Sequence, residues 1–232
     1  MAEDHAVRFA RIARELAAQR SEQAVLERVV ELAVQELDRC DDAGIMLLKR
    51  KQEVETAATS SDLVVHSDEA QARNREGPCF DAARNTVPWH NAVYRIDDTA
   101  TEDRWPAYVP EARELGVGAM MGFQLYREEE SFGALDLYAK EPHAFDDGSE
   151  RLGWVLASHA AVALNSVRTS DQLHTALETR QEIGKALGRV MERYGISDDM
   201  AFAVLQRASQ DNNIKLHTIA DEVVRTGRIP GV

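Results

Sequence analysis

The sequence predicts an α+β protein. A domain with a central antiparallel sheet flanked by helices is joined by a long helix to a small all-α unit of three helices. Three observations lead to this prediction. Apolar runs of strand length alternate with helical segments in the first part of the chain. One uninterrupted helical pattern then covers residues 147–193, and two short amphipathic segments follow it.

The first helical segment covers residues 6–39, where apolar side chains recur at helical spacing. Ser21 is expected to begin a second helix within this segment, because a serine side chain can accept a hydrogen bond from the first helical turn. The N-terminal residues therefore predict two amphipathic helices in succession.

Short apolar and β-branched segments predict five strands, at residues 43–48, 54–59, 93–96, 119–126 and 132–138. An acidic turn at 127–130 joins the last two strands into a hairpin. Between the strands, residues 60–85 indicate helix and loop, and a further helix is expected to begin at Arg104 and to end at Gly116. This mixed order of helices and strands is typical of an α+β domain.

The helix predicted at 147–193 contains no proline and carries a stripe close to coiled-coil spacing. One interpretation is a helix that covers the sheet and continues into the next domain. The other is a dimer seam that transmits a signal, and we expect a homodimer through these long helices. The stripe consists of Val155, His159, Val162, Ser166, Thr169, Leu173 and Leu177.

Two shorter helices are expected after Gly195, which should end the long helix. Ser197 is expected to cap the first of them. Asn213 or a neighbour is expected to cap the second, and Gly227 and Pro230 should terminate it.

Composition excludes several classes of protein. The N-terminus lacks the apolar centre of a signal peptide, and no run reaches the roughly 18 apolar residues of a membrane span, so the expected location is the cytoplasm. Cys40 and Cys79 form no C-x-x-C pair, and the seven histidines are scattered, so neither a disulfide framework nor a metal site is expected. No nucleotide-binding or nucleophile motif is present in the sequence, which favours a protein that is not an enzyme and needs no cofactor.

The net charge of −13 is unevenly distributed. Nine Lys and Arg residues and nine Asp and Glu residues lie from Ser166 onward, so the whole net charge belongs to residues 1–165. Any basic surface in the tail must come from the arrangement of its side chains. This distribution favours a protein that recognises nucleic-acid structure over one that binds by excess charge alone.

The segment 166–232 contains spaced residues in two stretches, Arg180-x-x-Ile183-x-x-Ala186-x-Gly188-x-Val190-Met191-Glu192-Arg193 and Ala201-Phe202-x-x-Leu205-x-Arg207-x-Ser209-Gln210-x-x-Asn213-x-Lys215-Leu216-x-x-Ile219-Ala220. Through these residues the segment resembles the ANTAR domain of transcription antitermination regulators. It implies a three-helix unit that binds paired hairpins in nascent RNA and thereby prevents formation of a terminator. Leu187 stands where the family usually has Lys, which puts one expected RNA contact in doubt.

Six residues are candidate RNA contacts, because Arg and Lys bind phosphates and Arg also stacks on bases. They are Arg180, Lys185, Arg189, Arg207, Asn213 and Lys215. In the alternative interpretation, Arg180 and Arg207 make salt bridges and Asn213 caps a helix. Ala186 and Gly188 are expected to allow close helix packing, since Gly in a helix is less favourable than Ala by about 1 kcal/mol.

Residues 1–165 contain four short motifs, Gly77-Pro78-Cys79-x-Asp81-Ala82, Arg104-Trp105-Pro106, Gly116-Val117 and Gly133-Ala134-Leu135-Asp136-Leu137-Tyr138. Through these motifs the segment resembles the GAF domain that precedes ANTAR in actinobacterial-type regulators. Asp136 stands where the family more often has Asn. The resemblance implies a pocket for a small ligand on one face of the sheet, although many GAF domains serve only in dimerisation.

Four residues are candidate ligand contacts in the GAF pocket, namely Cys79, Trp89, Phe123 and Tyr138. Cys79 follows Gly-Pro where a helix begins, a position that lowers a thiol pKa, so a redox sensor is one interpretation. Burial of Cys79 as a small apolar residue is the alternative, and the three aromatic residues are equally candidates for the core.

The sequence therefore predicts a signal-responsive, RNA-binding antitermination regulator. Its expected partners are nascent mRNA hairpins, a second copy of the chain and a small molecule in the GAF pocket, with no membrane. Two alternatives remain open. Three short helices can imitate a DNA-binding helix-turn-helix, and the tail could be a protein–protein module that has lost RNA binding.

Overall fold

The computed structural model describes residues 5–49, 53–84, 93–127 and 130–230. The chain divides into two compact units, Met1–Arg168 and Thr169–Val232. Helix α6 (Asp147–Tyr194) begins in the first unit and ends in the second. Each unit has its own hydrophobic core.

The first unit is built around an antiparallel sheet of five strands in the order β2-β1-β5-β4-β3. The strands predicted from the sequence are all present, with ends shifted by a residue or two. They are β1 Asp42–Leu48, β2 Val54–Thr59, β3 Val93–Ile96, β4 Ala119–Arg127 and β5 Glu130–Ala139.

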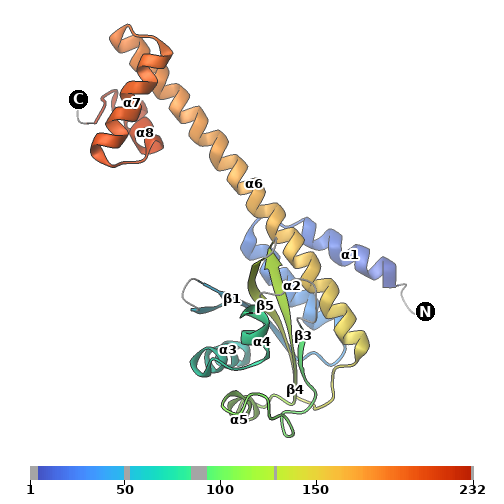
Figure 1. Ribbon diagram of the computed structural model, residues 1–232. Coiled ribbons are helices and arrows are strands. Elements are labelled where there is room, and N and C mark those ends of the chain that lie inside the picture. Colours follow the sequence, from blue (N-terminus) through green and yellow to red (C-terminus); the bar gives the residue numbers. More distant parts are fainter. Residues whose placement is uncertain (1–4, 50–52, 85–92, 128–129, 231–232) are drawn as a thin grey trace. The chain divides into compact units, whose positions relative to one another are not determined.

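One face of the sheet is covered by α1 (His5–Ala17), α2 (Glu22–Glu36) and the first part of α6 (Figure 1). Ser21 caps α2 as predicted, accepting a hydrogen bond from the backbone N–H of Ala24. Gly153 lets α6 approach the sheet closely, since a Cβ at this position would collide with the Phe123 ring.

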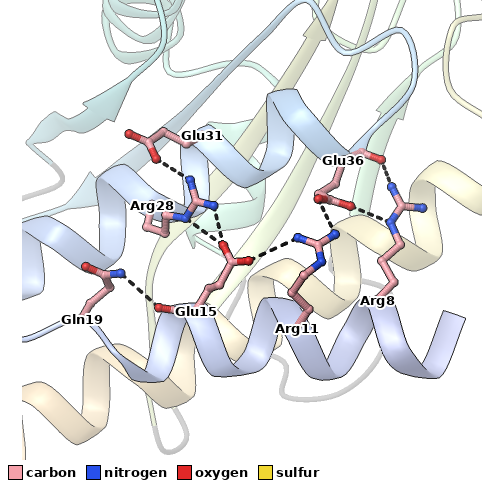
Figure 2. Close-up of polar contacts among 7 residues, drawn as sticks. All are labelled: Arg8, Arg11, Glu15, Gln19, Arg28, Glu31 and Glu36. Carbon is pink, nitrogen blue, oxygen red and sulfur yellow. Dashed lines mark hydrogen bonds and ion pairs between the residues drawn. The ribbon is translucent and has the colours of Figure 1, made fainter. Parts of the chain in front are cut away.

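Charged side chains hold α1 against α2 along the edge of this layer (Figure 2). Glu36 accepts from Arg8 Nε and from Arg11 Nη2, each at 2.7 Å. Glu15 on α1 pairs in the same way with Arg28 on α2. These ion pairs lie beside the buried Ile12 and Leu16, so charge fixes the register of two helices whose packing is apolar.

The other face of the sheet carries α3 (Asp62–Asn74), α4 (Pro78–Arg84) and α5 (Tyr108–Glu114). The sequence predicted that α5 begins at Arg104. This prediction is wrong, because the helix begins at Tyr108. Trp105 is buried and donates its indole N–H to Asp81 Oδ2 at 2.8 Å, so tertiary contacts hold residues 104–107 outside the helix.

The second unit packs the end of α6 against α7 (Asp198–Asn212) and α8 (Leu216–Thr226). Ser197 caps α7 as predicted, and of the residues expected to cap α8 it is a neighbour of Asn213 that does so, without a side-chain hydrogen bond. Asn213 ends α7 in a left-handed conformation with φ 52°, and Lys215 occupies the N-cap of α8. The core of the unit is formed by Ala186, Val190, Ala201, Leu205, Ala208, Ile219, Ala220, Val223 and Ile229.

Candidate nucleic-acid interface and sensor core

The end of α6 carries a row of exposed basic side chains. Lys185, Arg189 and Arg193 recur every four residues, so the helical period places them along one face. Arg193 was not among the predicted contacts, although this spacing could have identified it. The row is the main basic feature that α6 contributes to the second unit.

Two of these guanidinium groups lie close to the end of α8. Arg193 Nη1 donates to the backbone carbonyl of Gly227 at 2.5 Å. A Cβ on Gly227 would lie 3.7 Å from Arg193 Nη1 and 4.0 Å from Arg189 Nη1. The carbonyl end of a helix attracts cations, which explains this gathering. Arg225 and Arg228, also exposed, flank Gly227 in the chain.

Few of these charges are neutralised within the second unit. Among its described residues the one ion pair joins Arg207 and Asp211 at 3.6 Å, and both side chains are exposed. Arg207 thus makes a salt bridge, as in the alternative to its interpretation as an RNA contact. Lys185, Arg189 and Arg193 make no ion pair with described residues, so their charges are available to a partner.

Two hollows and a turn hold the candidates that remain, together with Lys185 of the basic row. Arg180 lines an open groove with Ile183 and Phe202. Lys185 shares a cleft of about 310 Å³ with His217 of α8 and with Glu178 and Glu182. The structure therefore brings Lys185 close to the start of α8. Asn213 and Lys215 are exposed at the turn between α7 and α8.

Two glycines expose the backbone of α6 beside the basic row. The expectation that Gly188 allows close helix packing is wrong, because a Cβ at Gly188 or at Gly184 would meet nothing within 4 Å. Ala186 between them is fully buried, as expected. The helical penalty of about 1 kcal/mol for each glycine is therefore not offset by packing within the unit.

A buried cluster of polar side chains lies between the sheet of the first unit and its helices α3, α4 and α5. Asp68 and Asp136 are fully buried, with no cation among the buried residues described. Thr56 donates to Asp68 at 2.7 Å, and Tyr138 donates to it at 3.4 Å. Neither carboxyl oxygen of Asp136 has a hydrogen-bond partner among the described residues.

Burial raises the pKa of both carboxyl groups. The pKa of Asp68 rises to about 7, against the opposing effect of its hydrogen bonds from Thr56 and Tyr138. The pKa of Asp136 rises well above its usual range through burial and then through the charge of Asp68. Two carboxylates in an apolar site cannot both ionise freely, so the pair retains a proton.

Cys79 lies in the same cluster, and its surroundings oppose thiolate formation. Burial first, and then the charge of Asp136, raise the pKa of its thiol well above the usual value. The structure therefore favours the interpretation of Cys79 as a buried residue over that of a redox sensor.

The four predicted ligand contacts do not form one site. Cys79 and Tyr138 face the core under α3, α4 and α5. Phe123 faces the opposite side of the sheet, where it meets Trp154 edge to face at 5.8 Å. Trp89 lies outside the described residues. Sequence reasoning missed Asp68 because α3 carries no motif that marks it.

Two family comparisons cover most of the chain. The GAF domain family matches residues 19–165, and the ANTAR domain family matches residues 171–224. The chain is a GAF and ANTAR domain protein. The GAF match contains the buried carboxyl pair, and the ANTAR match contains the basic row of α6. No curated protein matches the sequence.

Solved structures share the fold of the GAF unit at low identity. The GAF domain from Acinetobacter phosphoenolpyruvate-protein phosphotransferase is 16% identical with a TM-score of 0.55, over 73% of this chain and 97% of that one. A bacteriophytochrome from R. palustris is 11% identical with a TM-score of 0.64, over 82% and 44%. The fRMsr of Staphylococcus aureus is 14% identical with a TM-score of 0.51, over 67% and 94%. At these identities the likeness concerns the fold alone.

The two domains define the general kind of function. ANTAR is an RNA-binding antitermination domain and GAF is a signal-sensing domain, so the GAF and ANTAR protein has the architecture of a regulator. In the described part of the chain, no helix has both the length and the apolar character needed to cross a membrane.

Proposed function

We propose that the protein is a cytoplasmic, non-enzymatic antitermination regulator whose ANTAR unit binds paired hairpins in nascent RNA under control of the GAF unit. The observation that carries this proposal is the exposed row of Lys185, Arg189 and Arg193, which makes no ion pair with the described residues. RNA phosphates would supply the complementary charge.

The glycines of α6 support an RNA partner. Arg180, Gly184 and Gly188 follow one another at four-residue spacing, on a face next to that of the basic row. A helix surface without side chains lets a nucleic-acid backbone approach closely, while the neighbouring guanidinium groups contact phosphates or stack on loop bases. Leu187 is partly buried against the core of the unit, so at this position packing replaces the basic residue of the family.

A homodimer through α6 completes the proposal. Three large apolar side chains of the predicted stripe are exposed, Val162 to 69%, Leu173 to 61% and Leu177 to 65%. Exposed apolar residues at this spacing are typical of a helix that pairs with another. Two ANTAR units in one dimer would bind two linked hairpins with increased avidity.

The test is binding of the full protein to a two-hairpin RNA, with scrambled loops as control, at two salt concentrations. A Lys185→Ala/Arg189→Ala variant should bind more weakly and show a salt slope that is smaller by about one unit for each phosphate that it no longer neutralises. Arg14→Ala/Arg113→Ala is the matched control, because both arginines are exposed in the GAF unit. Equal binding by the two double variants would contradict the proposed interface, and preference for duplex DNA would favour a DNA-binding regulator.

A further inference from the structure

A second candidate binding site lies on the GAF unit, on the side of the sheet opposite the carboxyl pair. It is a groove of about 840 Å³ formed by α1, the end of α2, the loop before α6 and the first turns of α6. This volume is within the range of small-molecule sites in proteins. The groove belongs to the first unit alone.

Part of the groove lining is apolar. Phe9 of α1 and Trp154 of α6 are both partly buried against the core beneath, and Leu37, Leu152 and Val155 complete the surface. The Trp154 ring is held by its edge-to-face contact with Phe123 at 5.8 Å. A fixed indole beside a phenylalanine offers a surface for the flat body of an aromatic ligand.

Three arginines and three acids line the groove, and they differ in how many partners they already have. Glu36 is already neutralised by Arg8 and Arg11, which together outweigh its burial and lower its pKa. Asp146 accepts from the backbone N–H and the hydroxyl of Ser149, at 2.8 and 3.1 Å. Both carboxylate oxygens of Glu36 are therefore taken up by arginines, whereas the two bonds from Ser149 both use Oδ1 of Asp146.

Two arginines at the rim keep donors free. Arg151 is exposed and has no hydrogen bond or ion pair with the described residues. Arg39 uses one donor, Nη1, on the carbonyl of His143 at a long 3.4 Å. Asp38 is the one acid lining the groove to which the described residues give no such contact. A guanidinium group binds a carboxylate through two parallel hydrogen bonds, and Arg151 can supply them.

The backbone at the rim is strained on both sides. Arg39 and His143 have φ values of 66° and 54°, in the left-handed region that residues other than glycine seldom adopt. The hydrogen bond from Arg39 to His143 joins these two positions, both of which line the groove. Strain of this kind persists at sites where side chains must be held in a set place.

We propose that this groove binds a small aromatic carboxylate, with its ring against Trp154 and Phe9 and its carboxylate on Arg151 and Arg39. The ligand would contact the first turns of α6, the helix that continues into the ANTAR unit. It is a different site from the buried cluster on the other face of the sheet. Ligand binding in this groove does not depend on RNA binding. The test of the groove and the test of the proposed function can therefore fail separately.

The test is calorimetric titration of the full protein with indole-3-acetate and phenylacetate, with phenylacetamide and phenethylamine as neutral and cationic analogues. We expect saturable binding of the carboxylates and none of the analogues. Arg151→Gln should weaken binding on the order of tenfold or more, because the variant lacks a charge-assisted hydrogen bond. Arg113→Gln, an exposed arginine on α5 in the same unit, should leave binding unchanged.

Three results would overturn the proposal. They are no saturable binding of either carboxylate, equal binding of the amide or the amine, and equal weakening in the two arginine variants.

Sedimentation of both variants tests whether a second copy of the chain occupies the groove. If Arg151→Gln shifts the protein to a smaller species while no carboxylate binds, the groove is covered by a second copy of the chain instead.

Discussion

Replacing Asp68 with Asn should remove a dependence of GAF-unit stability on pH. The folded pKa of Asp68 is raised from 3.8 to about 7, so the native state holds this proton more tightly than the unfolded chain does. The resulting stabilisation is fully present below about pH 4 and is lost as the pH rises through about 7. In this window the wild-type protein should become less stable with rising pH.

The magnitude follows from the width of the window. One pKa unit corresponds to about 1.4 kcal/mol, so a rise from 3.8 to about 7 amounts to on the order of 4 kcal/mol of unfolding free energy over the whole window, and roughly two thirds of this change falls between pH 5 and pH 8. Asn cannot ionise, and its amide N–H can donate to a carboxyl oxygen of Asp136, which has no partner among the described residues. Asp68→Asn should therefore be more stable than wild type at pH 8 and lose most of that advantage at pH 5.

Tryptophan fluorescence during urea unfolding measures this quantity in the GAF unit alone. All three tryptophans lie in the first compact unit, so unfolding of the ANTAR unit does not contribute to the signal directly. The reasoning is refuted if wild-type stability stays constant between pH 5 and pH 8. It is equally refuted if Asp68→Asn retains the wild-type slope.

Three further predictions concern α6 and Cys79. Gly188→Ala should stabilise the ANTAR unit by roughly 0.5–1 kcal/mol, since the position is open, and yet weaken RNA binding in a gel-shift assay; unchanged affinity would argue against a close approach at this glycine. Leu173→Lys/Leu177→Lys should convert a dimer into a monomer in sedimentation velocity, whereas a wild-type protein that is already monomeric would contradict the proposed seam. Cys79 should resist a thiol reagent at pH 8 until the GAF unit unfolds in urea, and rapid labelling of the native protein would show that its thiol is accessible.

The sequence predicted the order of helices and strands because local patterns determine them. Helical spacing, the serine caps at Ser21 and Ser197 and the glycine after α6 all act within a few residues. The start of α5 could not be predicted in the same way. It depends on the hydrogen bond from Trp105 to Asp81, which lies 24 positions earlier in the chain.

The candidate ligand contacts show a second limit, which concerns strand register. Phe123 on β4 pairs with Leu135 on β5, and Leu135 faces the same core as Phe123. Tyr138 lies three positions beyond Leu135, so strand alternation turns it to the other face. The pairing between strands decides which residues of β4 and β5 share a face of the sheet, and the sequence does not reveal this pairing. The same alternation turns Asp136 to the face that carries Asp68, so that each carboxyl group affects the pKa of the other, and no local motif in the sequence indicates this.

The exposed part of α6 would connect the proposed dimer to signalling. Every residue from 170 to 178 is exposed, so no packing within one chain stabilises the helix there. An isolated helix of this length is marginal in water, and a segment that frays cannot carry a change at the GAF unit to the ANTAR unit. A second α6 packed on Leu173 and Leu177 would supply the stabilisation that one chain lacks. The packing that would form the proposed dimer is therefore the packing that signal transmission through α6 would require.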